Sequence, residues 1–199
     1  MARLALNKAS LTKLNRQLKS YQDFLPSLDL KRRQLLGEQA KAKQALVEIN
    51  QQLQELEPMI ASELIMLSNQ EVDLTDIVKV VGVDTVEENV MGTRLPKLNK
   101  VDIQVRKYAL LGRPHWVDRL VEVLKTAVEL RLQLQVAEQR RELLAQAART
   151  ITQRVNLFDK VLIPRTQADI KKIRIYLSDA ERAAVVNSKI AKRKKGAAA

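Results

Sequence analysis

Apolar residues recur along the first third of the chain in alternating steps of three and four positions. The series runs to Leu67, and only three of its members, Arg32, Gln39 and Glu63, are polar. A seam held over about eight heptads predicts a long helix whose apolar stripe packs along a partner helix in a left-handed coiled coil. The apolar members of this first seam are Leu11, Leu14, Leu18, Tyr21, Leu25, Leu28, Leu35, Ala42, Leu46, Ile49, Leu53, Leu56, Ile60 and Leu67.

Two prolines, Pro26 and Pro58, lie within the first seam. Proline removes a backbone donor and crowds the preceding turn of a helix. The heptad phase nevertheless survives both positions. We therefore expect kinks or local breaks whose flanking turns still face the same seam.

The second half of the chain repeats this spacing from Trp116 onward. After Leu162 the phase slips by one residue, and Pro164 lies at the slip. Because an untwisted helix drifts away from a strict heptad, we interpret the slip as a phase correction inside one very long helix. The members of this second seam are Leu120, Val123, Ala127, Leu130, Leu134, Ala137, Arg141, Leu144, Ala148, Ile151, Val155, Phe158 and Leu162, followed by Ile163, Ile170, Ile173, Leu177, Ala180 and Ala184.

Residues 70–115 lack the heptad spacing and are rich in Val and Ile. Apolar and polar residues alternate in two short runs, at Val78 and Val80 and again from Val101 to Val105, which is typical of strands. Gly112 and Pro114 then punctuate the entry to the second long helix. We expect a small β-hairpin that needs support from the helices or from another protein.

These patterns predict a mainly α fold, a long antiparallel coiled coil of two helices with a hairpin-containing middle segment. We expect the N-terminal helix over residues 1–69, the middle segment over 70–115, the C-terminal helix over 116–194 and a disordered tail over 195–199. Composition agrees, because five Gly and five Pro in 199 residues leave few turns. Cysteine is absent, which excludes a disulfide scaffold and a thiolate metal site.

The chain offers little chemistry of its own. It contains neither a phosphate-binding P-loop motif nor a dinucleotide-binding glycine motif, and we expect no catalytic residue, no cofactor and no metal. The single histidine, His115, stands at a helix start, where it more often caps or packs than binds a ligand. We interpret Glu87 and Glu88 as a polar loop tip. No apolar run is long enough for a membrane span, so we expect a soluble, intracellular chain without direct membrane insertion.

The formal net charge of +12 raises the question of nucleic-acid binding. Basic residues are spread along the chain and interleaved with acidic ones, and no aromatic stacking platform or zinc-finger spacing accompanies them. The densest cluster is the tail "KIAKRKKGAAA", which we interpret as a solvated helix end. Nucleic acid is therefore not an expected partner.

Three further stretches stand out, "LALNKASLTKLNRQLK", "EENVMGTRLP" and "RVNLFDKVLIPRTQADIKKIRIYLSDAER". Together they resemble the D subunit of V-type and A-type rotary ATPases. In that family an N-terminal helix, a middle hairpin and a C-terminal helix marked by R-V-N, I-P and E-R recur in this order. The resemblance spans nearly the whole chain. It implies partner-binding positions at Val90, Met91, Gly92, Leu95, Pro96, Arg154, Val155, Asn156, Ile163, Pro164, Glu181 and Arg182.

The resemblance implies a non-catalytic rotor in the central stalk of such a complex. Its expected partners are the nucleotide-binding A and B subunits of the hexamer, the F subunit of the stalk and the funnel-like C/d subunit above the membrane ring. The chain would then be cytoplasmic and peripheral to the membrane, and would couple ATP hydrolysis or synthesis to ion translocation. Two alternatives stay open, a free-standing coiled-coil scaffold and a basic helical hairpin that binds nucleic acid.

Overall fold

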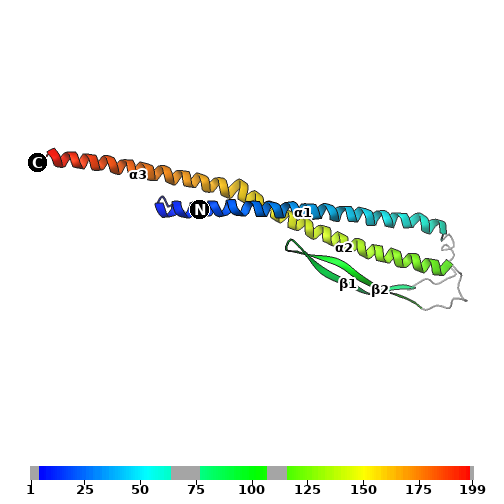
Figure 1. Ribbon diagram of the computed structural model, residues 1–199. Helices are drawn as coiled ribbons and strands as arrows, with labels where there is room; N and C mark the ends of the chain where they lie inside the picture. Colours follow the sequence, from blue (N-terminus) through cyan, green and yellow to red (C-terminus); the bar gives the residue numbers. More distant parts are fainter. Residues whose placement is uncertain (1–4, 64–76, 107–115, 198–199) are drawn as a thin grey trace. The chain divides into compact units, whose positions relative to one another are not determined.

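The computed structural model describes residues 5–63, 77–106 and 116–197. Its elements are helix α1 (Lys8–Glu63), strands β1 (Val78–Val90) and β2 (Thr93–Val105), helix α2 (Trp116–Leu157), the short π-helix η3 (Phe158–Leu162) and helix α3 (Ile163–Ala197) (Figure 1). The chain divides into two compact units. Unit 1 comprises Met1–Arg32 and Thr150–Ala199, and unit 2 comprises Arg33–Arg149.

Helix α1 begins with a side-chain cap. The backbone N–H of Ser10 donates to Asn7 Oδ1 at 2.7 Å, which satisfies one of the donors left unpaired at a helix start. The helix then continues through Pro26 and Pro58, both exposed, so neither proline breaks it.

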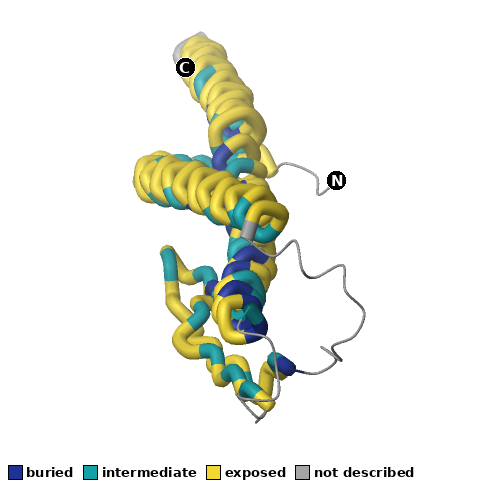
Figure 2. The backbone as a smooth tube through the Cα atoms, turned by 90° about the vertical axis from the view of Figure 1, so that its right-hand side faces the viewer, coloured by how far each residue is buried: buried dark blue, intermediate teal, exposed yellow. Residues whose placement is uncertain are grey.

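The first seam is confirmed as the covered side of α1. Each of its members from Leu11 to Ile60 is buried or half-buried, with Leu35 only 1% exposed. Residues between the members are mostly exposed, and Figure 2 shows the buried positions as limited patches between long exposed helical surfaces. The seam residues 64–69 lie outside the described residues.

In each unit α1 pairs with the second half of the chain. In unit 2, Ala42 and Ala45 of α1 line the same groove as Ala137 and Arg140 of α2. In unit 1, the rings of Tyr21 and Phe158 meet edge to face with their centroids 5.4 Å apart. The α1 residue with the lower number contacts the residue with the higher number in the second half of the chain, as expected for helices that run in opposite directions. The predicted antiparallel pairing of two long helices is therefore confirmed.

The phase slip coincides with the π-helix η3. In this turn the N–H of Ile163 donates to the carbonyl of Phe158, five residues back instead of four. A π turn accommodates one extra residue, so the positions that follow it move one place beyond a strict heptad. Thr166, Ile170 and Ile173 are accordingly buried. The sequence located the correction at Pro164, whereas the structure places the extra residue in Phe158–Leu162, which ends two residues before this proline.

Proline alone does not account for the π turn. Pro26 and Pro58 lie in α1, which is α-helical throughout its described length. Pro164 differs in following a turn that already carries an extra residue, and it has no N–H with which to extend the π pattern. The spacing of the apolar residues therefore explains the π turn, and Pro164 limits its length.

The predicted hairpin is present and is longer than a minimal one, with 13 residues in each strand. The strands are antiparallel, with Val90 opposite Thr93. Register shifts between Val80 and Gly82 and between Asp84 and Thr85 mark bulges. Because a two-stranded ribbon is marginal alone, it needs a supporting surface.

Helix α2 supplies that surface along the length of the hairpin. At the strand ends, Ile77 packs with Val117 and Val121 in a buried cluster. Farther along, residues 98–101 of β2 line a groove with Glu129 and Gln133 of α2. Helix α2 therefore carries two apolar faces within unit 2, one toward α1 and one toward the hairpin. The positions of Gly112, Pro114 and His115 lie outside the described residues.

Candidate functional site

The turn of the hairpin holds the first group of candidate residues. Met91 and Gly92 form its two-residue connection, and both have positive φ, 52° and 80°. This geometry is that of a type I′ turn, which matches the twist of the flanking strands. The N–H of Gly92 donates to Asn89 Oδ1 at 2.9 Å, so a side chain near the end of β1 is hydrogen-bonded to the turn. Met91 is 42% exposed, so the turn presents an apolar side chain to the surroundings.

An ion pair holds this end of the hairpin against α2. Arg140 Nη1 donates to Glu88 Oε2 at 2.8 Å, although the residues are 52 positions apart. The hydrogen bond and the charge of Arg140 lower the pKa of the Glu88 carboxyl. Glu88 and its neighbour Glu87 lie in β1 and not in a loop, so the interpretation of these residues as a polar loop tip is wrong. Within the same unit Leu95 is fully buried and Pro96 is half-buried.

The second group of candidate residues lies on either side of the π turn in unit 1. Arg154 and Asn156 are exposed in the last turn of α2, whereas Val155 between them is only 6% exposed. Ile163 and Pro164 are the first two residues of α3. The last turn of α2 therefore exposes the Arg154 guanidinium and the Asn156 amide, while Val155 packs on the covered side of the helix.

Glu181 and Arg182 form the third group and lie farther along α3. Both are exposed, and Arg182 Nη1 lies 4.0 Å from Asp179 Oδ1 within the same helix. At about 1.5 Å per residue they lie roughly 26 Å from Pro164. The R-V-N and I-P residues therefore lie close to each other on either side of the π turn, and the E-R pair lies farther along α3. The hairpin residues belong to the other unit.

The burial of these residues separates two kinds of position. Leu95 and Val155 pack within this chain, so their side chains stabilise the hairpin and the helix pair. Met91, Arg154, Asn156 and Arg182 present side chains outward. Contact of any of the twelve residues with a partner stays a prediction.

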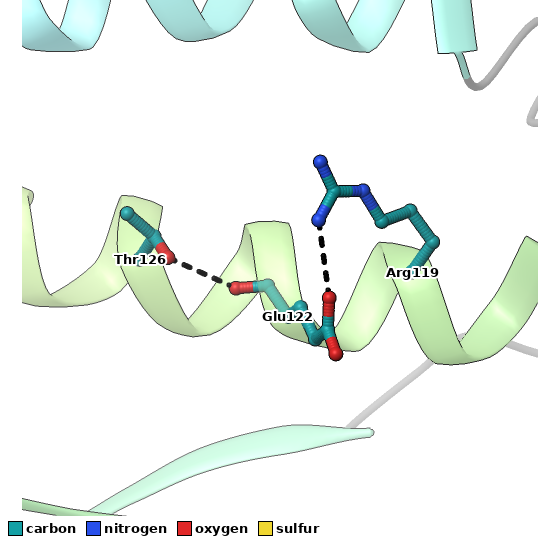
Figure 3. Close-up of polar contacts among 3 residues, drawn as sticks. All are labelled: Arg119, Glu122 and Thr126. Carbon is teal, nitrogen blue, oxygen red and sulfur yellow. Dashed lines mark hydrogen bonds and ion pairs between the residues drawn. The ribbon is translucent and has the colours of Figure 1, made fainter.

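Near the start of α2, polar side chains make contacts within the helix itself. Arg119 Nη1 donates to Glu122 Oε2 at 3.1 Å, and the hydroxyl of Thr126 donates to the carbonyl of Glu122 at 3.1 Å. Both contacts are drawn as dashed lines in Figure 3. Such i,i+3 and i,i+4 contacts are ordinary on a helix surface. Within the described ranges no group of three or more His, Asp or Glu residues is arranged to hold a metal ion. In the same ranges no helix has an apolar stretch sufficient to cross a membrane.

Sequence reasoning missed several residues that position these groups. Val117 and Val121 fall outside the second seam because they serve the hairpin face of α2, and an apolar pair four residues apart was the available signal. Thr166 is buried, and its hydroxyl donates a hydrogen bond to the Leu162 carbonyl at 2.7 Å. The partnership of Glu88 with Arg140 has no signal in a single sequence.

Comparison with known proteins agrees with this architecture. The family model for the D subunit of ATP synthase matches residues 10–193. A V-type ATP synthase D subunit from Borreliella burgdorferi is 35% identical over 192 residues, which cover 96% of this chain and 95% of the relative. The corresponding V-type ATP synthase D subunit of Chlamydia pneumoniae is 31% identical over 191 residues, 95% of this chain and 91% of the relative. The chain therefore belongs to the family of ATP synthase D subunits.

Proposed function

We propose that this chain is the rotor of the central stalk in a V-type or A-type rotary ATPase or ATP synthase, and that it catalyses no reaction itself. The observation that carries the proposal is the pairing of α1 with α2, η3 and α3 through seams that remain covered in both units. Two helices packed along a continuous seam resist bending and twisting better than one helix. Relatives named as the D subunit of a V-type ATP synthase support placement in a multi-subunit complex.

The proposed partners are the nucleotide-binding A and B subunits, the F subunit of the stalk and the funnel-like C/d subunit. The exposed members of the candidate groups, such as Met91, Arg154 and Arg182, are the proposed contact residues. In this arrangement the chain is peripheral to the membrane on its cytoplasmic side. Coupling of ATP hydrolysis or synthesis to ion translocation then passes through the rotor.

Coupling in this proposal is differential contact. The rotor presents a different side chain set to each surrounding subunit at each angle. A subunit that contacts one side of the rotor more favourably in its closed state is shifted toward that state. No chemistry on the rotor is needed for this shift, because only the difference in contact free energy between the two states matters.

A reversible cross-link tests rotation. Lys172 is exposed on α3 between the buried Ile170 and Ile173, so a cysteine there faces away from the helix pair. The chain has no native cysteine, so Lys172→Cys introduces its single thiol. Oxidation with a cysteine engineered on a facing hexamer subunit within disulfide reach bonds the rotor to the ring. We expect near-complete loss of steady ATP hydrolysis, recovery with reductant, and retained nucleotide binding.

The controls separate rotation from damage by oxidant. Complexes with the unsubstituted, cysteine-free chain and the same ring variant must keep their activity under oxidant. Lys172 is preferred to Ser188, because a helix end that frays could swivel while the rest of the rotor turns. Full hydrolysis in quantitatively cross-linked complexes would refute the rotor role and favour a scaffold that is merely attached to the ring.

A further inference from the structure

Arg140 of α2 contacts two other elements of unit 2. Its Nη1 donates to Glu88 Oε2 in β1 at 2.8 Å. The same residue lines a groove of about 180 Å³ between α1 and α2, together with Ala42 and Ala45 of α1 and Ala137 of α2. The Arg140 side chain is 24% exposed, so most of its length is covered. Arg140 therefore lies where the helix pair and the hairpin meet.

A second carboxylate borders this groove from the side of α1. Glu38 and Lys41 both line the groove, and Lys41 Nζ lies 2.8 Å from Glu38 Oε1. Glu38 is 31% exposed, whereas Lys41 is 75% exposed, so the Lys41 ammonium is mostly solvated. Rotation about the outer side-chain torsions of Arg140 moves its guanidinium across a groove of this size. Arg140 therefore has two carboxylates to choose between, Glu88 in the hairpin and Glu38 in α1.

Each of these two carboxylates has a further cation near it. Lys41 pairs with Glu38. The hydrogen bond and the charge of Arg140 are the main causes that lower the pKa of the Glu88 carboxyl, and the charge of Lys97 adds to them. A turn of Arg140 from one carboxylate to the other therefore leaves neither without a neighbouring positive charge. Because exposed ion pairs are weak, the two pairings differ little in free energy.

An apolar contact also holds this end of the hairpin. Leu95 lies opposite Glu88 in the ladder and is 0% exposed. Its buried side chain anchors the end of the hairpin within unit 2 whichever carboxylate Arg140 binds. The ion pair adds to this anchor only while Arg140 binds Glu88. The partner of Arg140 therefore affects how tightly the end of the hairpin is held, and not whether the hairpin is attached.

We propose that Arg140 is a positioning residue that divides its time between Glu88 and Glu38, and thereby couples the pairing of α1 with α2 to the hairpin. With Arg140 on Glu88, the ion pair and Leu95 together hold the end of the hairpin. With Arg140 on Glu38, α1 is tied to α2 and Leu95 alone holds the hairpin end. A change in α1 that favours the Glu38 pairing loosens the hairpin, and lifting of the hairpin strengthens the contact between the helices. This coupling is a property of the chain alone and does not depend on the rotor role.

Hydrogen exchange of the ladder amides in residues 85–98 of the full-length chain measures how often the end of the hairpin opens. Two substitutions in α1, both outside the hairpin, test the second partner. Glu38→Gln removes the alternative carboxylate, so Arg140 stays on Glu88 and exchange should slow by about twofold. Lys41→Gln removes the cation that competes for Glu38, so Arg140 shifts toward Glu38 and exchange should quicken by about twofold.

Matched controls remove the same charges from α1 away from the groove. Lys43→Gln is the control for Lys41→Gln and Glu55→Gln for Glu38→Gln, because both control residues are exposed and neither lines the groove. Both controls should leave hairpin exchange unchanged. Arg140→Gln should quicken it by about threefold and, in double variants, abolish the effects of the two α1 substitutions. Circular dichroism of every variant checks that the helix content is unchanged.

Opposite effects of Glu38→Gln and Lys41→Gln that vanish without Arg140 are the result that supports the coupling. Unchanged hairpin exchange in both variants, with faster exchange in Arg140→Gln, would assign Arg140 the single partner Glu88 and overturn the proposal. Effects of the α1 substitutions that persist without Arg140 would overturn it too, because they would arise from the charges in α1 directly. Since the chain is measured without other subunits, each of these outcomes leaves the rotor role untouched.

Discussion

The π turn makes a prediction that distinguishes two single-residue deletions in unit 1. Deleting one residue from a helix rotates everything beyond it by about 100° relative to what precedes it. Asp159 lies in the π turn and is exposed, and Gln167 lies in α3 and is also exposed. Deletion of Asp159 removes the extra residue, so the turn closes as an ordinary α turn and Ile170 and Ile173 keep their covered positions.

Deletion of Gln167 acts in the opposite sense. It leaves the π turn in place and moves Lys171 into the position of Ile170 and Arg174 into that of Ile173. Those isoleucines are 5% and 0% exposed, so two fully covered side chains are lost to solvent. At about 1.5–3 kcal/mol for each the loss is about 3–6 kcal/mol, before the cost of covering two charges. Deletion of Asp159 should change the free energy of unfolding by no more than about 1 kcal/mol, since it exposes no apolar surface.

Thermal unfolding followed by circular dichroism measures the difference. For a chain of this size, 1 kcal/mol corresponds to roughly 2–4 °C, so deletion of Gln167 should lower Tm by about 6 °C or more. Hydrogen exchange of residues 163–177 should report faster opening in that variant only. Pro164 is present in both variants, so its effect on the helix is common to them. Equal destabilisation by the two deletions would show that the π turn does not set the phase of α3.

Three further predictions concern unit 2. Leu144→Ala should lower the free energy of unfolding by about 2–5 kcal/mol, measured by denaturant titration, because Leu144 is fully buried. The neighbouring Leu143 is 37% exposed, so Leu143→Ala should lower it by less than about 1 kcal/mol in the same titration. Arg140→Gln should raise the pKa of Glu88, which NMR of the Glu88 carboxyl carbon measures. Because that pKa is lowered in the folded chain, the ion pair stabilises the hairpin at pH values above the ordinary pKa of glutamate. This stabilisation is lost as the pH falls through the lowered pKa. An unchanged Glu88 titration would contradict the contact. Met91→Asn should slow hydrogen exchange in β1 and β2, because asparagine adopts positive φ at lower cost than methionine, and faster exchange would count against the turn geometry.

The hairpin shows how far alternation alone could lead. Alternating Val and Ile residues predicted a small hairpin, but the position of the hairpin on α2 depends on contacts between distant residues. Glu88 and Arg140 are 52 positions apart, and nothing near either residue indicates its partner. Val117 and Val121 likewise gain their role only when Ile77 packs against them.

The sequence by itself determined the two long helices, their seams and the presence of a one-residue phase slip near Pro164, because heptad spacing is a local property of the chain. Only the tertiary structure decided that the slip is taken up by a π turn at Phe158–Leu162, since the heptad phase alone is compatible with a kink, a break or a wider turn. Only the tertiary structure decided where the charge of the chain gathers. Residues 5–32 and 150–197 are far apart in sequence, and antiparallel folding joins them in one unit of charge +12. Charge summed along the chain hides this separation, because folding determines which segments share a surface.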